Sequence, residues 1–193
     1  MNIPYPPAKR PLPKHAKKVF TGEIFDVYQW EQEMYDGSTV IFEKIKRADT
    51  VSVIPITTEQ KILISHEEQP GLKPFYGVFG GRIEPEENPL SAAKRELLEE
   101  TGYLAHRLRP IMSFYASPGI LSEKLHAFAA TELQKATASP ELGEDIELLP
   151  MPLEAAIQMI HHGEIQDAKT IVTLMAYHRW GVLAPIPVEG GIK

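Results

Sequence analysis

Three glutamates in the middle of the chain are spaced so that one helix would bring their side chains together. Glu96 and Glu100 are four residues apart and Glu99 lies beside both, so on a helix all three carboxylates share one face. Neighbouring carboxylates repel each other, and a bound divalent cation removes that cost. Oxygen ligands suit Mg²⁺, with Mn²⁺ as an alternative. Taken alone, the three glutamates fit a solvated helix face equally well, because glutamate is a good helix former.

A helix over residues 89–101 is expected to carry these glutamates. Asn88 is a favourable N-cap, Pro89 suits the first helical position, and Gly102 is a common residue just beyond a helix C-terminus. Arg95 lies next to the acidic face, where its guanidinium can hold a carboxylate through a bidentate contact. The local sequence thus predicts both the helix and a basic side chain that orders its acidic face.

The rest of the chain predicts an α/β (α+β) fold in which helices pack on the faces of a mixed β-sheet. Hydrophobic periodicity indicates strands over residues 19–33, 39–46, 51–56, 61–65, 111–115, 126–133 and 144–149, and helices over residues 153–162 and 167–180. We expect three parts, namely a proline-rich arm with a β-hairpin extension over residues 1–48, a main domain over 49–182 and a flexible tail over 183–193.

The composition excludes several classes of site and partner. The chain of 193 residues has no cysteine, which excludes disulfides, thiolate metal sites and thiol nucleophiles, and its seven histidines show no metal-ligand spacing. The formal net charge is −6 and there is no basic stripe, so we expect no nucleic-acid partner. No stretch approaches the roughly 18 apolar residues that span a bilayer. The N-terminus lacks the apolar core of a signal peptide, so we expect a cytoplasmic protein without a membrane partner.

The segment that begins at Gly81 resembles the Nudix box of the Nudix hydrolase superfamily. The box is a glycine, five residues, a glutamate, seven residues and then Arg-Glu-aliphatic-any-Glu-Glu-any-Gly followed by an apolar residue. Its charged and glycine positions are matched here by Gly81, Glu87, Arg95, Glu96, Glu99, Glu100 and Gly102. Such agreement arises by chance on the order of one time in a billion per starting position. Tyr103 stands where an aliphatic residue is usual and fills the same buried slot.

The resemblance implies a fold and a set of metal ligands. The Nudix fold is a mixed β-sheet sandwiched between helices, in which the box forms a loop, a helix and a loop; here a small N-terminal antiparallel β extension is added. By the same resemblance Glu96 and Glu100 would be ligands of Mg²⁺, and Glu99 would share a bridging or supporting part. The carbonyl of Gly80, just before the box, would add a further ligand.

Catalytic roles beside the metal ligands also follow from the resemblance. Glu87 would orient the carboxylate cluster, and Arg95 would brace it. In related enzymes a glutamate on a mobile loop beyond the box assists as a base. Residues 139–145 are the candidate loop in this chain, and we favour Glu144, with Glu141 or Glu99 as alternatives. An exposed acidic turn explains the glutamates of this loop equally well.

The flanks of the box resemble the ADP-ribose pyrophosphatase subgroup. A Ser-Pro-Gly turn lies about 15 residues past the box, and the segment that follows it is also similar. Pro118, Gly119 and Glu123 in this region are candidate substrate-binding residues. The N-terminal extension is similar too, and in that subgroup it helps to build a dimer. The resemblance therefore implies a homodimer that uses Mg²⁺ to hydrolyse a small nucleotide sugar, ADP-ribose, to AMP and ribose 5-phosphate.

A departure from the subgroup affects the substrate contacts. Residues 68–70 read Glu-Gln-Pro where the subgroup often has Gln-any-Arg, so an expected phosphate-binding arginine is missing. Arg47, Lys73 and Arg82 are the candidates to replace it, and Arg47, at the end of the predicted hairpin, is the best of them. Trp30 is a candidate platform for stacking the adenine, a contact that contributes roughly 1–3 kcal/mol. An aromatic side chain on a strand is, however, more often part of a core.

Rival functions stay open on the sequence alone. The same chemistry would serve GDP-mannose, another nucleotide sugar or a dinucleoside polyphosphate. An NADH pyrophosphatase is disfavoured, because its zinc cysteines and its downstream Ser-Gln-Pro-Trp-Pro type signature are absent. A non-catalytic Nudix module that senses ADP-ribose belongs to a different class. The three box glutamates argue against such a module, since sensors can lose them.

Overall fold

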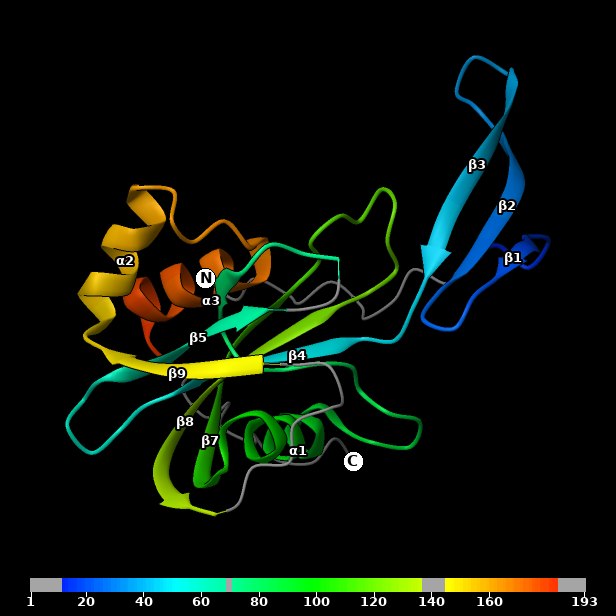
Figure 1. Ribbon diagram of the computed structural model, residues 1–193. Helices are drawn as coiled ribbons and strands as arrows, with labels where there is room; N and C mark the ends of the chain where they lie inside the picture. Colours follow the sequence, from blue (N-terminus) through cyan, green and yellow to red (C-terminus); the bar gives the residue numbers. More distant parts are fainter. Residues whose placement is uncertain (1–11, 69–70, 137–144, 184–193) are drawn as a thin grey trace, which may run out of the picture. The chain divides into compact units, whose positions relative to one another are not determined.

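The computed structural model describes residues 12–68, 71–136 and 145–183 of the chain. Its contacts divide the chain into two units (Figure 1). The first comprises Met1–Asp49 and Tyr115–Lys124, and the second comprises Thr50–Phe114 and Leu125–Lys193. The tail expected over residues 183–193 lies, apart from residue 183, outside the described residues. The described residues contain no helix that is long and apolar enough to cross a bilayer.

The first unit is built on an antiparallel sheet of three strands in the order β1-β2-β3. The strands are β1 (Lys17–Thr21), β2 (Asp26–Glu33) and β3 (Thr39–Lys46). The prediction of one strand over residues 19–33 was wrong, because the Gly22 amide donates to the Phe25 carbonyl at 3.0 Å and turns the chain there. The predicted hairpin turn is confirmed: Asp36 accepts the Ser38 amide at 2.9 Å, and Gly37 has a φ of 80°.

The second unit contains two further sheets and three helices. Its strands are β4 (Thr50–Pro55), β5 (Ile62–Glu68), β6 (Phe75–Gly77), β7 (Tyr103–Phe114), β8 (Leu125–Lys135) and β9 (Asp145–Met151). Its helices are α1 (Pro89–Thr101), α2 (Leu153–His161) and α3 (Ala168–Trp180). The sheet β4-β8-β7 is mixed, since β4 runs parallel and β7 antiparallel to β8, whereas the sheet β6-β5-β9 is antiparallel.

Strand β4 separates two hydrophobic clusters because its side chains alternate between the faces of the sheet. Val51 and Val53 pack with Ala93 and Leu97 of α1 on one face. On the other face Ile54 packs in a cluster to which α2 and α3 contribute. All six residues of β4 are buried, as expected for a strand covered on both faces. The predicted sandwich of a mixed sheet between helices is thus confirmed (Figure 1).

Strand β7 is longer than predicted. It begins at Tyr103, directly after α1, whereas the sequence indicated a strand only from residue 111. The register with β8 shifts between Pro110 and Met112. A proline cannot donate a hydrogen bond to its neighbour strand, and a bulge accommodates it. Because of this proline, strand propensity predicts only the second half of a strand that is continuous in the structure.

Helix α1 begins and ends at the predicted residues. The Asn88 side chain accepts the Ser91 amide at 2.9 Å, and Pro89 occupies the first turn, where its missing N–H costs nothing. Gly102 adopts the left-handed conformation at φ 68°, and its amide donates to the Leu98 carbonyl. These caps fix the first and last residues of the helix and therefore the positions of Glu96, Glu99 and Glu100 along it.

Candidate functional site

The backbone just before the box is bound along strand β4. The Val53 amide donates to the Phe79 carbonyl at 2.8 Å, and the Val51 amide donates to the Gly81 carbonyl at 2.9 Å. Gly80 lies between these two acceptors with a φ of 134°, a conformation that residues with a side chain rarely adopt. A Cβ at Gly80 would lie 2.2 Å from the Val51 carbonyl oxygen. Only glycine fits here, because the segment passes so close to β4.

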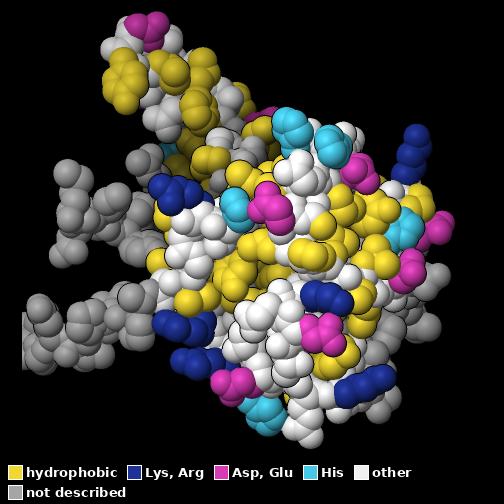
Figure 2. Space-filling view, turned by 90° about the vertical axis from the view of Figure 1, so that its left-hand side faces the viewer, with side chains coloured by type: hydrophobic (Ala, Val, Ile, Leu, Met, Phe, Trp, Pro, Cys, Tyr) yellow, Lys and Arg dark blue, Asp and Glu magenta, His cyan; other side chains and the backbone are white. Residues whose placement is uncertain are grey.

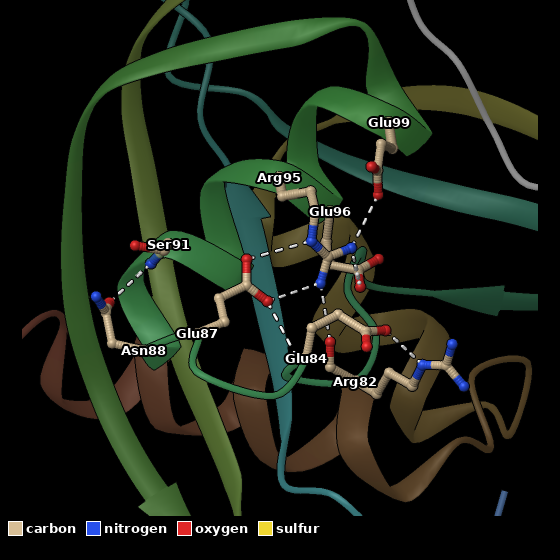
Figure 3. A network of polar contacts seen from close by, with 8 residues as sticks. All are labelled: Arg82, Glu84, Glu87, Asn88, Ser91, Arg95, Glu96 and Glu99. Carbon is tan, nitrogen blue, oxygen red and sulfur yellow. Dashed lines mark hydrogen bonds and ion pairs between the residues drawn. The ribbon is translucent and has the colours of Figure 1, made fainter.

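A single guanidinium holds the box carboxylates together (Figure 3). Arg95 binds Glu87 in a bidentate manner, with Nε to Oε1 at 3.2 Å and Nη2 to Oε2 at 3.0 Å. Its Nη1 donates to Glu96 at 2.8 Å and to Glu99 at 3.0 Å. Its Nη2 also donates to the Arg82 carbonyl at 2.9 Å. The predicted bracing contact therefore exists and reaches three carboxylates, of which Glu87 receives the bidentate pair.

The charges in this network shift each other's proton affinity. The Arg95 hydrogen bonds lower the pKa of Glu87, and the hydrogen bond from the Glu84 amide at 3.1 Å acts in the same direction, while partial burial opposes both. Conversely, the hydrogen bonds to Glu87 raise the pKa of Arg95, with those to Glu96 and Glu99 contributing in the same direction. Glu87 thus stays ionised at neutral pH, and the guanidinium stays charged beside it.

Glu100 is oriented by the backbone just before the box. Its Oε2 accepts the Gly80 amide at 2.8 Å, so the residue before the box is bound to the last turn of α1. Glu96 lies close to the same stretch of backbone, because a Cβ at Gly81 would lie 2.6 Å from its Oε1. The absence of a side chain at Gly81 therefore makes room for the Glu96 carboxylate, and its absence at Gly80 lets the backbone pass close to Val51 while the Gly80 amide reaches Glu100.

The donor atoms of this region suit a hard divalent cation. Glu96, Glu99 and Glu100 offer only carboxylate oxygens, which Mg²⁺ and Mn²⁺ prefer. Within residues 12–68, 71–136 and 145–183, however, no three acidic, histidine or cysteine side chains are arranged as a ready-made metal site. The donor set fits the cation, and the metal ligands remain a proposal.

Two predicted residues fall outside this network or outside the described chain. The side chain of Arg82 is exposed, and its Nε lies 2.6 Å from Glu84 Oε1; its carbonyl, as noted, accepts a hydrogen bond from Arg95. The backbone of Arg82 therefore contacts Arg95 directly, and its side chain pairs with Glu84, whose amide donates to Glu87. Glu144 and the alternative Glu141 lie outside the described residues.

The first unit brings together most of the other candidates for substrate binding. Arg47 Nε lies 3.7 Å from Glu123 Oε2, and Glu123 is buried. The turn at Pro118 and Gly119 precedes a segment whose Ile120 carbonyl accepts the Ile45 amide at 2.8 Å. Through this pairing the loop after β7 meets the end of β3, although the two are separated by about 70 residues of sequence.

Trp30 has neighbours within its own sheet. It lies opposite Phe42 in the pairing of β2 with β3, and the ring centroids are 5.8 Å apart. Its Nε1 donates to Gln32 Oε1 at 3.1 Å. The indole is therefore half-buried against its own sheet, and a stacking contact with substrate remains a proposal.

The sequence reading missed three side chains that lie at or near these features. Glu67 of β5 is a buried carboxylate that accepts the Ser65 hydroxyl at 3.0 Å, in a place left open by Gly77. Thr170 of α3 accepts the Val78 amide at 3.0 Å. Periodicity gives no signal for either residue, because each partner is set by tertiary packing. In the first unit, Asp49 accepts the Lys124 amide at 3.1 Å, a contact across 75 residues.

Comparison with known proteins gives consistent matches. The NUDIX domain family model matches residues 46–174. ADP-ribose pyrophosphatase from Bacillus subtilis (strain 168) is 35% identical over 157 residues, which cover 80% of this chain and 85% of that protein. GDP-mannose pyrophosphatase from Citrobacter koseri is 30% identical over 159 residues, covering 79% of this chain and 80% of that protein. The crystal structure of an ADP compounds hydrolase aligns with a TM-score of 0.75 at 20% identity, over 86% of this chain and 91% of that chain. At this identity the likeness shows the fold.

The lowered pKa of Glu87 predicts a specific pH dependence of stability. Because the folded state binds the ionised form more tightly, the stabilisation is fully present above the pKa of an unfolded glutamate, about 4.3. It is lost as the pH falls through the lower folded pKa. We expect the difference in the free energy of unfolding between the wild type and Glu87→Gln to be constant from neutral pH to about pH 5 and to shrink below it. Urea denaturation at several pH values measures this, and a difference independent of pH would contradict the role of the Arg95 pair.

Proposed function

The chain belongs to the Nudix family, and on this basis we propose that it hydrolyses the diphosphate bond of a nucleoside diphosphate sugar, with ADP-ribose as the substrate. The products would be AMP and ribose 5-phosphate. The observation that carries the proposal is the Arg95 network, which gathers Glu87, Glu96 and Glu99 on the helix whose Glu100 is bound to Gly80. The relative from Bacillus subtilis supports the choice of ADP-ribose.

Phosphoryl transfer depends mainly on positioning and on neutralising charge, and the described side chains suit both tasks. Glu96, Glu99 and Glu100, with the Gly80 carbonyl, would hold Mg²⁺, or Mn²⁺ in its place. When bound, such a cation neutralises the charge of the diphosphate and lowers the pKa of a water. The Gly80 amide orients Glu100 at 2.8 Å, so this carboxylate is fixed before substrate arrives.

Arg95 and Glu87 support the cluster from outside the proposed ligand set. Arg95 keeps Glu96 and Glu99 close together despite their like charge, since one Nη1 donates to both. Glu87 holds the guanidinium in this orientation through its bidentate contact. Both residues are partly shielded from water, which strengthens their mutual attraction relative to an exposed pair.

Substrate contacts and the general base rest on the sequence. We keep Glu144 as the proposed base; full turnover by Glu144→Gln would remove it from the mechanism. Arg47, Glu123 and the turn at residues 118–119 form the proposed contacts from the first unit, supported by the proximity of Arg47 to Glu123. Trp30 in the same unit remains the proposed adenine platform, and an unchanged KM in Trp30→Ala would contradict that role. Arg82 stays a proposed phosphate contact, although its side chain now pairs with Glu84.

A second candidate substrate is GDP-mannose. The observation in its favour is the 30% identity to GDP-mannose pyrophosphatase over most of both chains. Hydrolysis of either compound uses the same carboxylates, because both present a diphosphate between a nucleoside and a sugar. The two substrates therefore differ in the contacts of their nucleobase and sugar with the protein. The proposed metal-binding residues serve both substrates equally.

We further propose that the protein acts as a homodimer in the cytoplasm. Exposed apolar side chains gather on the first unit: Val19, Phe20, Ile24, Val40, Ile41 and Phe42. Figure 2 shows hydrophobic side chains of this unit at the surface, at the top of the view. Several exposed apolar side chains on one small sheet support the proposal that this sheet takes part in an interface. A second copy of the chain is the partner that the subgroup resemblance implies.

The enzymatic proposal predicts that Glu100→Gln loses activity while it keeps its fold. We expect turnover of ADP-ribose to require Mg²⁺ and to fall at least about 100-fold in the variant, because a metal-binding carboxylate is lost. Release of AMP measures this, with GDP-mannose assayed beside ADP-ribose. The matched control is Glu154→Gln, which removes an exposed carboxylate from helix α2. Full activity of Glu100→Gln would contradict the proposed metal site, and preference for GDP-mannose would change only the substrate.

The dimer proposal predicts that Ile41→Glu disrupts association. Ile41 is 60% exposed on β3, so a glutamate there leaves the isolated chain intact but places a charge in the interface. Light scattering coupled to gel filtration should give twice the chain mass for the wild type and one chain mass for the variant. Met175→Glu on α3 is the control, as Met175 is an exposed apolar residue of the second unit. A wild-type monomer, or a dimer disrupted by Met175→Glu alone, would contradict the proposal.

A further inference from the structure

Helix α3 carries two buried hydroxyl groups, each hydrogen-bonded to a different part of the second unit. Thr170 and Thr173 are both 0% exposed. Thr170 Oγ1 accepts the Val78 amide at 3.0 Å, and Thr173 Oγ1 lies 2.9 Å from Ser52 Oγ of β4. The two threonines are three residues apart and so lie on the same face of the helix. One contact therefore reaches the backbone before the box, and the other reaches a side chain of the sheet.

The hydrogen-bond directions at Thr170 are fixed by its partners. The Val78 amide is a donor, so Thr170 Oγ1 must act as the acceptor in that contact. The hydroxyl proton is then directed to Asp167 Oδ2, which lies 2.6 Å away. The same Oδ2 accepts the Thr170 amide at 2.9 Å and thereby caps the helix. The Asp167 carboxylate thus holds the hydroxyl in the orientation that Val78 requires.

Val78 begins a stretch of four residues, Val78–Gly81, that we name the glycine strap. Each of its residues is bound to another element. The Val78 amide donates to Thr170 of α3, and the carbonyls of Phe79 and Gly81 accept from β4. The Gly80 amide donates to Glu100 of α1. The strap therefore connects α3 through two residues of backbone to the carboxylate that we assign to the metal.

We propose that Asp167 and Thr170 are positioning residues for the metal site of the proposed function, on which this inference rests. They act through the glycine strap: the hydroxyl fixes the Val78 amide, and the peptide that follows sets the direction of the Gly80 amide and carbonyl. Gly80 tolerates little adjustment, because its backbone runs so close to β4 that a Cβ there would lie 2.2 Å from the Val51 carbonyl oxygen. A shift at Val78 is therefore passed on to Glu100 instead of being absorbed by the strap.

Thr173 supplies the matched control for this role. It is equally buried on the same face of α3, and its hydroxyl likewise makes one contact outside the helix. Its partner Ser52 belongs to β4, and no hydrogen bond among the described residues joins the Ser52 side chain to the strap. Valine replaces threonine with nearly the same shape, so Thr170→Val and Thr173→Val each delete one buried hydroxyl. The two variants differ in whether the deleted hydroxyl is itself hydrogen-bonded to the strap: that of Thr170 is bonded to the Val78 amide, whereas that of Thr173 is bonded to the Ser52 side chain of β4.

The experiment measures binding of Mn²⁺ alone, without substrate, by titration calorimetry and by the loss of the free Mn²⁺ electron paramagnetic resonance signal. Thr170→Val should bind Mn²⁺ about 10- to 100-fold more weakly than the wild type, the effect typical of losing a residue that orients a ligand. Thr170→Ser keeps the hydroxyl and should restore the affinity. Thr173→Val should keep the wild-type affinity. Both valine variants should lower the Tm of the metal-free protein by a few degrees, about 2–4 °C.

Any of the following results would overturn the inference. Unchanged Mn²⁺ affinity in Thr170→Val with a lowered Tm would make the contact merely structural. An equal loss of affinity in Thr173→Val would make the effect general to the helix. Absence of Mn²⁺ binding by the wild type would overturn the proposed function together with this inference. Failure of this inference alone would leave Mn²⁺ binding by the wild type intact. If Thr170→Val does not fold, Asp167→Gly decides, because glycine is tolerated at a helix N-cap but offers no acceptor to orient the Thr170 hydroxyl. It should weaken Mn²⁺ binding, and unchanged affinity would overturn the inference.

Discussion

The attraction between the Arg95 guanidinium and the surrounding carboxylates is the interaction on which the candidate site depends. Glu96 and Glu99 would repel each other across one turn of α1, and Glu87 enters from the preceding loop. Arg95 offsets this repulsion because its planar fork donates to all three at 2.8–3.2 Å. A lysine in its place would offer a point charge and lose the bidentate contact with Glu87. Arg95 therefore stabilises Glu96 and Glu99 on the acidic face, while the Gly80 amide stabilises Glu100.

A second constraint comes from the sheet. The backbone before the box runs so close to β4 that Gly80 has no room for a side chain, and the space over Gly81 is taken by Glu96. Because both positions lack a Cβ, backbone groups and carboxylates come within hydrogen-bonding distance of each other. Helix α1 supplies the carboxylates, β4 fixes the backbone, and α3 holds that backbone through Thr170. The geometry of the site is thus a property of three packed elements, and no single motif determines it.

Local signals carried most of the prediction from sequence. The caps at Asn88 and Gly102 defined α1, and the spacing of residues three and four apart placed the glutamates on one face with Arg95 beside them. The sequence failed where tertiary context decides the outcome. Pro110 concealed half of β7, because a bulge accommodates the proline. Thr170 and Val78 are 92 residues apart in the sequence, so no local hydrophobic periodicity predicts their contact. The approach of Arg47 to Glu123 likewise depends on how a loop returns to β3.

We propose that the carboxylates of α1 bind a divalent cation beside Gly80. Anomalous X-ray diffraction from crystals soaked in Mn²⁺ tests it most directly, because it locates the ion without reference to activity. We expect an anomalous peak within about 2.0–2.5 Å of oxygens of Glu96 and Glu100, with the Gly80 carbonyl facing it. A fully occupied Mn²⁺ site elsewhere, with no peak at these carboxylates, would contradict the account.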